Sequence, residues 1–206
     1  MEYRTEDGTV IGNVDKKYES RNPIARALMN GFLSSFDDLV RRTGVTSVHE
    51  VGCGEGHLSA RLARMELNIR SSDFSRQIVE QAASLNPSPR IKYSVRSIYD
   101  LNPETDKAPL VVCCEVLEHL EQPLRGLQQL SKITGEYCLL SVPREPVWRI
   151  LNMARGKYLR DFGNTPGHIQ HWGKKSFAKF VSQQFEVIEI RSPLPWTMLL
   201  CRPYPA

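Results

Sequence analysis

Val48-His-Glu-Val-Gly-Cys-Gly-Glu-Gly56 joins an apolar segment, residues 46–51, to three glycines, and an amphipathic segment follows at once. Glycine adopts backbone angles that a Cβ forbids, and it lets a ligand approach the main chain closely. A helix N-terminus adds unpaired N–H groups and a positive dipole end, which suit an anionic ligand group. The stretch predicts a strand, a tight glycine turn and a helix start. Such a turn either binds a nucleotide or only connects the strand to the helix.

The composition indicates one globular domain. The 206 residues are 41% hydrophobic and 24% charged, with a formal net charge of +4, which permits an anionic partner without favouring nucleic acid. The five cysteines include no CxxC spacing, so a zinc or disulfide framework is not expected. Neither a signal segment nor an apolar run of membrane-spanning length is visible. We therefore expect a cytoplasmic protein.

Apolar, strand-like segments alternate with amphipathic, helix-like segments along the chain. This order predicts an α/β fold with a doubly wound, mainly parallel sheet. The expected strands cover residues 46–51, 67–73, 91–95, 109–114, 135–143, 185–190 and 196–201. The expected helices cover residues 24–42, 75–85, 123–133 and 174–183, with one more directly after Gly56.

The region before the glycine turn divides into a polar arm, residues 1 to about 22, and the helix over 24–42. The helix has a start signal at Asn22-Pro23 and a stop signal at Gly44. It either packs against the sheet or acts as a lid, with Tyr18 or the Asn22-Pro23 turn closing over a ligand. We treat 1–44 as arm and lid helix, and 45–206 as the ligand-binding domain.

Asp73 ends the second expected strand, 19 residues after Gly54. At this spacing an acid can reach the two ribose hydroxyls of a nucleotide, and a carboxylate can accept from both at once. The alternative is that Asp73 caps the helix that begins near Ser75.

Two motifs resemble those of the class I S-adenosylmethionine (SAM) methyltransferases. The G-x-G-x-G turn, with Glu50 two residues before the first glycine, resembles motif I of that family. Glu115-Val-Leu-Glu-His-Leu120, after the buried fourth strand, resembles the V-L-E-H-L segment of the same family. The resemblance covers residues 24–202. It implies a Rossmann-like, doubly wound, seven-stranded sheet with an antiparallel last strand, and SAM as the cofactor.

The resemblance also implies which residues contact the cofactor. Glu50 and the glycines would hold the methionine end, Asp73 the ribose and Ile98 the adenine. Ser97 stands where the family usually carries an acid for the adenine amino group, which is a departure from the pattern. The predicted cofactor set is Glu50, Gly52, Cys53, Gly54, Gly56, Asp73, Phe74, Ser97, Ile98, Cys114 and Glu115.

Glu115, Glu118 and His119 form a second candidate site. On a helical turn all three can face one point, because they lie three and four residues apart. Two carboxylates and an imidazole suit Mg²⁺, Mn²⁺ or a similar divalent ion. His168, in Thr165-Pro-Gly-His-Ile-Gln-His-Trp172, is the natural fourth ligand.

This arrangement, with Trp172 and Phe177 following His168, resembles the metal-dependent small-RNA 3′-end 2′-O-methyltransferases and the ubiquinone-pathway O-methyltransferases. A V-L-E-H-L segment also occurs in family members that hold no metal. In that case His119 or His168 is the candidate general base, with Glu118 beside it. His171 is a second choice as base. His49 and His57 are expected to have structural roles.

The segment over 144–172 is an insertion relative to a minimal fold. Its first part, 144–160, combines five basic residues with the apolar residues Trp148, Ile150, Leu151 and Met153. It is either a solvated helix packed on the sheet or a substrate cap. A cap would bind an anionic head group through its arginines or rest on a membrane surface.

The sequence therefore predicts a SAM-dependent methyltransferase that acts on a small-molecule or lipid-like acceptor, at oxygen, with a possible metal. One alternative is an RNA-end 2′-O-methyltransferase, which the mild net charge and the lack of an RNA-binding appendage disfavour. Another is a SAM-binding partner subunit without catalytic activity.

Overall fold

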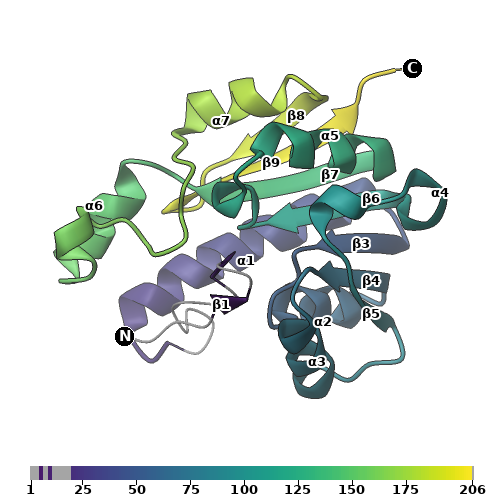
Figure 1. The fold of residues 1–206 in the computed structure, drawn as a ribbon, viewed down its shortest axis with the longest axis horizontal. Coiled ribbons are helices and arrows are strands. Elements are labelled where there is room, and N and C mark those ends of the chain that lie inside the picture. The colour runs from purple at the N-terminus through teal and green to yellow at the C-terminus, as the bar shows by residue number, and fades with distance from the viewer. Residues whose placement is uncertain (1–4, 7–8, 11–19, 206) are drawn as a thin grey trace.

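The computed structural model describes residues 5–6, 9–10 and 20–205, and it places a seven-stranded sheet between two layers of helices (Figure 1). The strand order is β5-β4-β3-β6-β7-β9-β8. The strands are β3 (Ser47–Val51), β4 (Asn68–Asp73), β5 (Ile91–Val95), β6 (Ala108–Cys114), β7 (Thr134–Pro143), β8 (Phe185–Arg191) and β9 (Trp196–Pro203).

The helices alternate with the strands, as the sequence pattern predicts. They are α1 (Pro23–Thr43), α2 (His57–Arg64), α3 (Arg76–Leu85), α4 (Pro103–Asp106), α5 (Pro123–Ile133), α6 (Val147–Ala154) and α7 (Lys174–Val181). Short 3-10 turns are η2 (Ile98–Asp100), η3 (Leu117–His119) and η4 (Leu159–Asp161). A separate antiparallel pair joins β1 (Thr5–Glu6) to β2 (Thr9–Val10).

The last strand, β9, lies between β7 and β8 and runs antiparallel to both. The other neighbours in the sheet pair in parallel. The predicted fold class, a doubly wound seven-stranded sheet with an antiparallel last strand, is therefore confirmed.

Two hydrophobic cores lie on opposite faces of the sheet. Successive residues of β6 alternate between them, because side chains of a strand point to opposite faces. Leu110 and Val112 join the core under α1 and α2, and Val111 and Cys113 join the core under α5 and α7. Leu110 to Cys113 are all completely buried, which explains the near-continuous apolar run of this strand.

Helix α1 packs against the sheet, which confirms one of its two predicted roles. Phe32, Phe36 and Leu39 are almost fully buried in the core formed with the sheet. Asn22 caps the helix, since its side-chain oxygen accepts hydrogen bonds from the N–H groups of Ile24 and Ala25 at 2.9 and 3.2 Å. The predicted lid role of Tyr18 lies outside the described residues.

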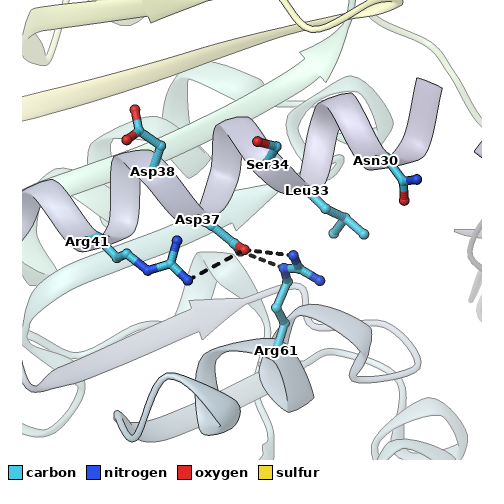
Figure 2. A pocket seen from close by; sticks show the side chains of 7 residues that line it. All are labelled: Asn30, Leu33, Ser34, Asp37, Asp38, Arg41 and Arg61. Atoms are coloured by element: carbon cyan, nitrogen blue, oxygen red, sulfur yellow. Dashed lines mark hydrogen bonds and ion pairs between the residues drawn. The ribbon is translucent and has the colours of Figure 1, made fainter. Parts of the chain in front are cut away.

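A polar pocket opens between α1 and α2 (Figure 2). Its acid, Asp37, is already paired, because the Arg61 guanidinium donates to both carboxylate oxygens and Arg41 lies 4.0 Å away. The lining contains none of the predicted site residues and is Asn30, Leu33, Ser34, Asp37, Asp38, Arg41 and Arg61. The pocket therefore contains an ion pair that joins the two helices, and it is not a candidate site.

Helix α6 projects beyond the carboxyl end of β7, on the same side of the molecule as the start of α1 (Figure 1). Together with η4 it forms the segment that the sequence sets apart as an insertion. Among the residues that the structure describes, no helix has the length and apolar character needed to cross a membrane.

Candidate functional site

The glycine turn after β3 has the geometry that its sequence predicts. Gly52, Gly54 and Gly56 have φ angles of 75°, 53° and 78°, in the left-handed region that favours glycine. A Cβ on Gly52 would lie 2.3 Å from a methyl carbon of Val116, so a larger residue cannot fit there. A Cβ on Gly54 would meet nothing within 4 Å, so open space lies beside its main chain. Gly56 is the N-cap of α2.

Asp73 spans the gap between the glycine turn and the next helix. One of its carboxylate oxygens accepts from the Gly54 N–H at 3.0 Å and the other from the Ser75 N–H at 3.1 Å. The N-cap of α3 is Ser75, whose hydroxyl oxygen accepts from the Ile78 N–H. Asp73 is thus not the helix cap itself, and its ribose-binding role stays a prediction.

Glu50 lies buried under the turn, with 3% of its surface exposed. Its carboxylate accepts a hydrogen bond from Ser59 in α2, and the Ser59 hydroxyl also lies 2.8 Å from that of Ser71. Burial disfavours the charged form and raises the pKa of Glu50 to about 8, and the Ser59 hydrogen bond offsets part of that shift. Glu50 is therefore largely protonated at neutral pH.

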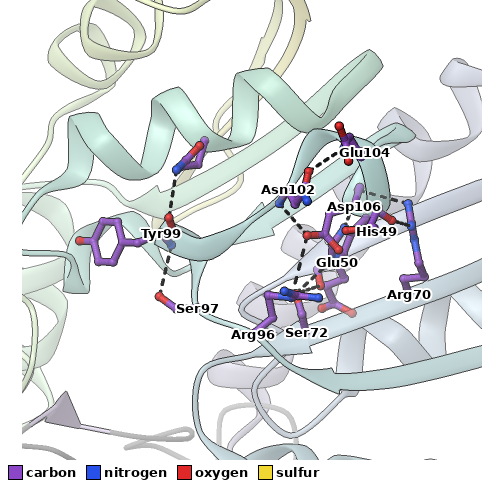
Figure 3. Close-up of polar contacts among 12 residues, drawn as sticks. His49, Glu50, Arg70, Ser72, Arg96, Ser97, Tyr99, Asn102, Glu104 and Asp106 are labelled. Atoms are coloured by element: carbon purple, nitrogen blue, oxygen red, sulfur yellow. Dashed lines mark hydrogen bonds and ion pairs between the residues drawn. The ribbon is translucent and has the colours of Figure 1, made fainter.

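The remaining predicted cofactor residues differ in exposure. Cys53 and Cys114 are buried, and burial raises the pKa of both thiols. The Phe74 side chain is 41% exposed. The Ser97 hydroxyl oxygen accepts from the Tyr99 N–H at 3.2 Å and caps η2, as Figure 3 shows, and Ile98 is buried in the core under α5.

His49 has structural partners on both ring nitrogens (Figure 3). Nδ1 lies 2.9 Å from the Asp106 carbonyl oxygen, so this nitrogen donates, and Nε2 lies 3.0 Å from the Ser72 hydroxyl. Burial lowers the pKa of His49. These contacts join β3 to β4 and to α4, which fits the structural role predicted for this residue.

The segment after β6 does not form the helical turn that the sequence analysis assumes. Glu115 has a φ of 60°, and only Leu117–His119 form a 3-10 turn. The Glu115 carboxylate accepts from the Trp196 indole N–H at 2.7 Å and from the Ser141 hydroxyl at 3.2 Å. The expected convergence of Glu115, Glu118 and His119 on one point is therefore wrong for Glu115, because its backbone turns the side chain toward β7 and β9.

Glu118, His119 and His168 do converge. Their potential ligand atoms all lie within 4.8 Å of one another, although His168 is about 50 residues away in the sequence. Glu118 and His168 are buried, with 1% and 9% of their surfaces exposed, and His119 is half-buried. The two imidazole rings meet edge to face, with centroids 4.9 Å apart.

Main-chain hydrogen bonds hold this group together. The N–H groups of Ile169 and Gln170 donate to the Glu118 carbonyl at 2.9 and 3.0 Å. His119 Nδ1 lies 2.9 Å from the Gly167 carbonyl oxygen. A carbonyl can only accept, so Nδ1 carries the proton and Nε2 of the neutral ring keeps its lone pair. His119 Nε2 can therefore take a proton or bind a metal ion.

Aromatic residues that the sequence analysis does not assign to the site lie beside it. The Trp148 ring, from α6, lies 5.9 Å from the His168 ring and 5.6 Å from the Trp196 ring. Trp196 in turn lies 5.0 Å from Phe32 of α1. No spacing in the sequence relates these residues, because they come from three separate elements.

The other residues singled out near His168 lie apart from the group of three. Trp172 packs against Phe177 and Phe180 of α7, with ring centroids 5.7 and 5.0 Å apart. His171 is exposed. His57 begins α2 and lies 3.4 Å from the Glu55 carboxylate.

Comparison with known proteins agrees with this geometry. Residues 48–135 match the family model described as a methyltransferase domain. The ubiquinone biosynthesis O-methyltransferase of Xanthomonas oryzae pv. oryzae is 32% identical over 118 residues, which make up 54% of this chain and 49% of that protein. The enzyme of the same name from Xanthomonas campestris pv. campestris is 33% identical over the same shares. The chain thus spans about half the length of the curated relatives it matches.

Two solved structures share the fold. Magnesium protoporphyrin IX methyltransferase from Synechocystis PCC 6803, solved with bound SAH (S-adenosylhomocysteine), has a TM-score of 0.66 and 19% identity over 89% of each chain. A bacterial Hen1 methyltransferase domain has a TM-score of 0.62 and 21% identity, over 85% of this chain and 99% of that one. At these identities the likeness concerns the fold.

The sheet order and the glycine turn at its carboxyl edge define a domain of the class I methyltransferase type. The sequence match to a methyltransferase domain covers residues 48–135 and lies within that fold. This chain thus has the class I methyltransferase fold, matches a methyltransferase domain over residues 48–135, and resembles the ubiquinone biosynthesis O-methyltransferases over about half of its length.

The raised pKa of Glu50 predicts a pH-dependent stability. The folded state holds a proton that the unfolded state releases above its ordinary pKa of 4.5, so unfolding becomes easier as pH rises from about 4.5 to about 8. Glu50→Gln keeps an acceptor for Ser59 and removes the titration. We expect the variant to match the natural protein near pH 5 and to exceed it in stability at pH 9, measured by urea unfolding. Equal pH dependence of both proteins, with exposed Glu80→Gln as control, would contradict this prediction.

The position of Asp73 predicts weaker cofactor binding in Asp73→Asn. A hydrogen bond to a charged group contributes about 1.5–3 kcal/mol, so the dissociation constant for SAH should rise roughly tenfold or more. Isothermal titration calorimetry measures this change. Asp161→Asn, on exposed η4, is the matched control and should bind SAH as the natural protein does. Unchanged SAH affinity in Asp73→Asn would mean that the Asp73 carboxylate stabilises the glycine turn and does not bind the cofactor.

Proposed function

We propose that this protein transfers the methyl group of SAM to an oxygen of a small-molecule or lipid-like acceptor, beside Glu118, His119 and His168. The observation that carries this proposal is the convergence of these three side chains. Glu118 and His119 follow β6, which pairs in parallel with β3, so they lie at the same edge of the sheet as the glycine turn. The names of the ubiquinone biosynthesis O-methyltransferases support oxygen as the acceptor atom.

The reaction needs mainly positioning, because the sulfonium of SAM is already a good leaving group. The acceptor oxygen attacks the methyl carbon, the carbon–sulfur bond breaks, and its electrons remain on sulfur. His119 Nε2 takes the hydroxyl proton, since the Gly167 carbonyl fixes the proton of the ring on Nδ1. His168 and the buried Glu118 stabilise the imidazolium that forms.

A divalent metal ion fits the same residues. One carboxylate and two imidazoles are a mixed oxygen and nitrogen set that suits such ions. When bound, the ion would act as a Lewis acid toward the acceptor hydroxyl. Glu118, His119 and His168 would hold it, and Glu115 would stay with Trp196 and Ser141.

The site predicts that His119 variants lose methyl transfer. We expect His119→Gln to reduce the rate by roughly 10²–10⁴-fold, as for loss of a general base, while SAH affinity stays unchanged. Transfer from SAM with a labelled methyl group is measured on a catechol, a long-chain phenol and a short RNA with a free 3′ end. His171→Gln, which alters an exposed histidine outside the group, is the matched control.

Each result of this assay has one meaning. Transfer to RNA alone would contradict the proposal and indicate an RNA-end 2′-O-methyltransferase. No transfer to any acceptor, with SAH binding intact, would favour a partner subunit without catalytic activity. Calorimetric titration of Mn²⁺ into chelator-treated, SAH-saturated protein distinguishes a metal-assisted reaction from one that uses a metal-free base. Stoichiometric heat that His119→Ala/His168→Ala abolishes would establish the metal, and activity that survives the chelator would establish the metal-free base.

The surface of the α6–η4 segment supports a lipid-like acceptor and a peripheral membrane contact. Its apolar side chains Ile150, Met153, Leu159 and Phe162 are 54%, 37%, 59% and 73% exposed. The exposed Arg155 and Arg160 lie in the same segment. Apolar residues that insert and basic residues that attract anionic head groups are the combination found on membrane-surface segments. A cytoplasmic location stays a prediction.

The exposed apolar residues predict binding to anionic vesicles. We expect the protein to sediment with phosphatidylglycerol vesicles, less with phosphatidylcholine vesicles, and less as salt rises. Leu159→Ser/Phe162→Ser should lose this binding. Leu85→Ser, which alters a residue of α3 that is also 59% exposed, should keep it. Equal sedimentation of all three proteins would contradict the membrane contact.

A further inference from the structure

Asn152 is a buried polar residue on α6, whose other residues are half-buried or exposed. It is 1% exposed, whereas its neighbour Met153 in α6 is 37% exposed. Its side-chain NH₂ group donates to the Gly163 carbonyl at 2.9 Å and to the Thr165 hydroxyl oxygen at 3.2 Å. Its carbonyl oxygen accepts from Arg155. These partners fix the orientation of the amide, because a carbonyl accepts and a guanidinium donates.

Thr165 receives a second donor from the same helix. The Trp148 indole N–H donates to its hydroxyl oxygen at 2.9 Å. Trp148 and Asn152 lie four residues apart, so they point from one face of α6 toward the same atom. Thr165 is 6% exposed, so removal of the hydroxyl would take this acceptor away from both donors inside the protein.

The loop that starts at Thr165 carries His168. The His168 N–H donates to the Thr165 carbonyl at 3.1 Å, and the Asn164 amide donates to the His168 carbonyl at 3.1 Å. On its other side, the loop is bonded to His119 through Gly167. Helix α6 thus holds one end of the loop, and the segment after β6 holds the other.

We propose that Thr165 is a positioning residue, through which α6 fixes the His168 imidazole against Glu118 and His119. A ligand or surface that moves α6 would then move His168, which couples binding on the outer face of this helix to the reacting groups. The inference rests on the proposed function for the role of His168, but the link itself does not depend on catalysis.

Two variants at one position test the link. Thr165→Ser keeps the hydroxyl. Thr165→Val keeps the shape but removes the acceptor of the Trp148 N–H and one of the two acceptors of the Asn152 amide. The readout is the His168 imidazole ¹H–¹³C signal in the SAH complex, assigned by its loss in His168→Gln. We expect Thr165→Ser to reproduce the natural signal and Thr165→Val to give a displaced or doubled one. Ile150→Ser, on the exposed face of α6, should leave it unchanged.

The controls separate positioning from general damage. SAH affinity should be the same in Thr165→Val as in the natural protein, because the glycine turn and Asp73 are not part of the link. A His168 signal that is unchanged in Thr165→Val would overturn the proposal. If Thr165→Val fails to fold, Asn152→Leu, which removes the other donor to Thr165 and leaves the Trp148 ring beside His168 unchanged, replaces it with the same expected displacement. Failure of methyl transfer would sink the proposed function and leave this result standing.

Discussion

The parallel pairing of β3 with β6 is the constraint on which the candidate site depends. Glu50 stands opposite Val112 in this pair, so both strands end at the same edge of the sheet. The two chain segments that leave this edge touch, because a Cβ on Gly52 would collide with Val116. The glycine turn and the Glu118–His119 turn are therefore neighbours by the register of the sheet, and no additional element is needed to bring them together.

Glu50 and Glu118 are deeply buried near this edge, and burial makes their charge costly. Glu50 responds by holding a proton at neutral pH, while Glu118 lies close to two imidazoles. A cation near either carboxylate would reduce the cost of its ionisation. SAM carries a positive sulfonium and a positive ammonium group. In the proposed function, Glu118 would face an imidazolium or a metal ion. The two halves of the site are thus suited to positive charge, although the whole chain is only mildly basic.

Most of the fold follows from the sequence, because its strands and helices have clear periods and clear ends. The helix over 123–133 is predicted at the bounds that the structure shows, as is the strand over 91–95. Glu118, His119 and His168 are predicted as a group and found as one. Glu115 is predicted with them but lies apart, since its backbone is left-handed and its carboxylate accepts from Trp196 and Ser141. Thr165 and Asn152 give no signal at all, because their importance lies in contacts between distant segments.

In this geometry His119 Nε2 can act as a base or bind a metal ion, but one atom cannot do both. His119 has one lone pair, on Nε2, because the Gly167 carbonyl holds the proton on Nδ1. A metal ion bound at Nε2 would prevent His119 from taking the proton of the acceptor. Glu115 is held by Trp196 and Ser141, so three side chains would bind the ion. Three protein ligands leave part of the coordination shell to other molecules, which is the arrangement of catalytic rather than structural metal sites. A metal in this protein would therefore act on the acceptor, and its presence would decide which group removes the proton.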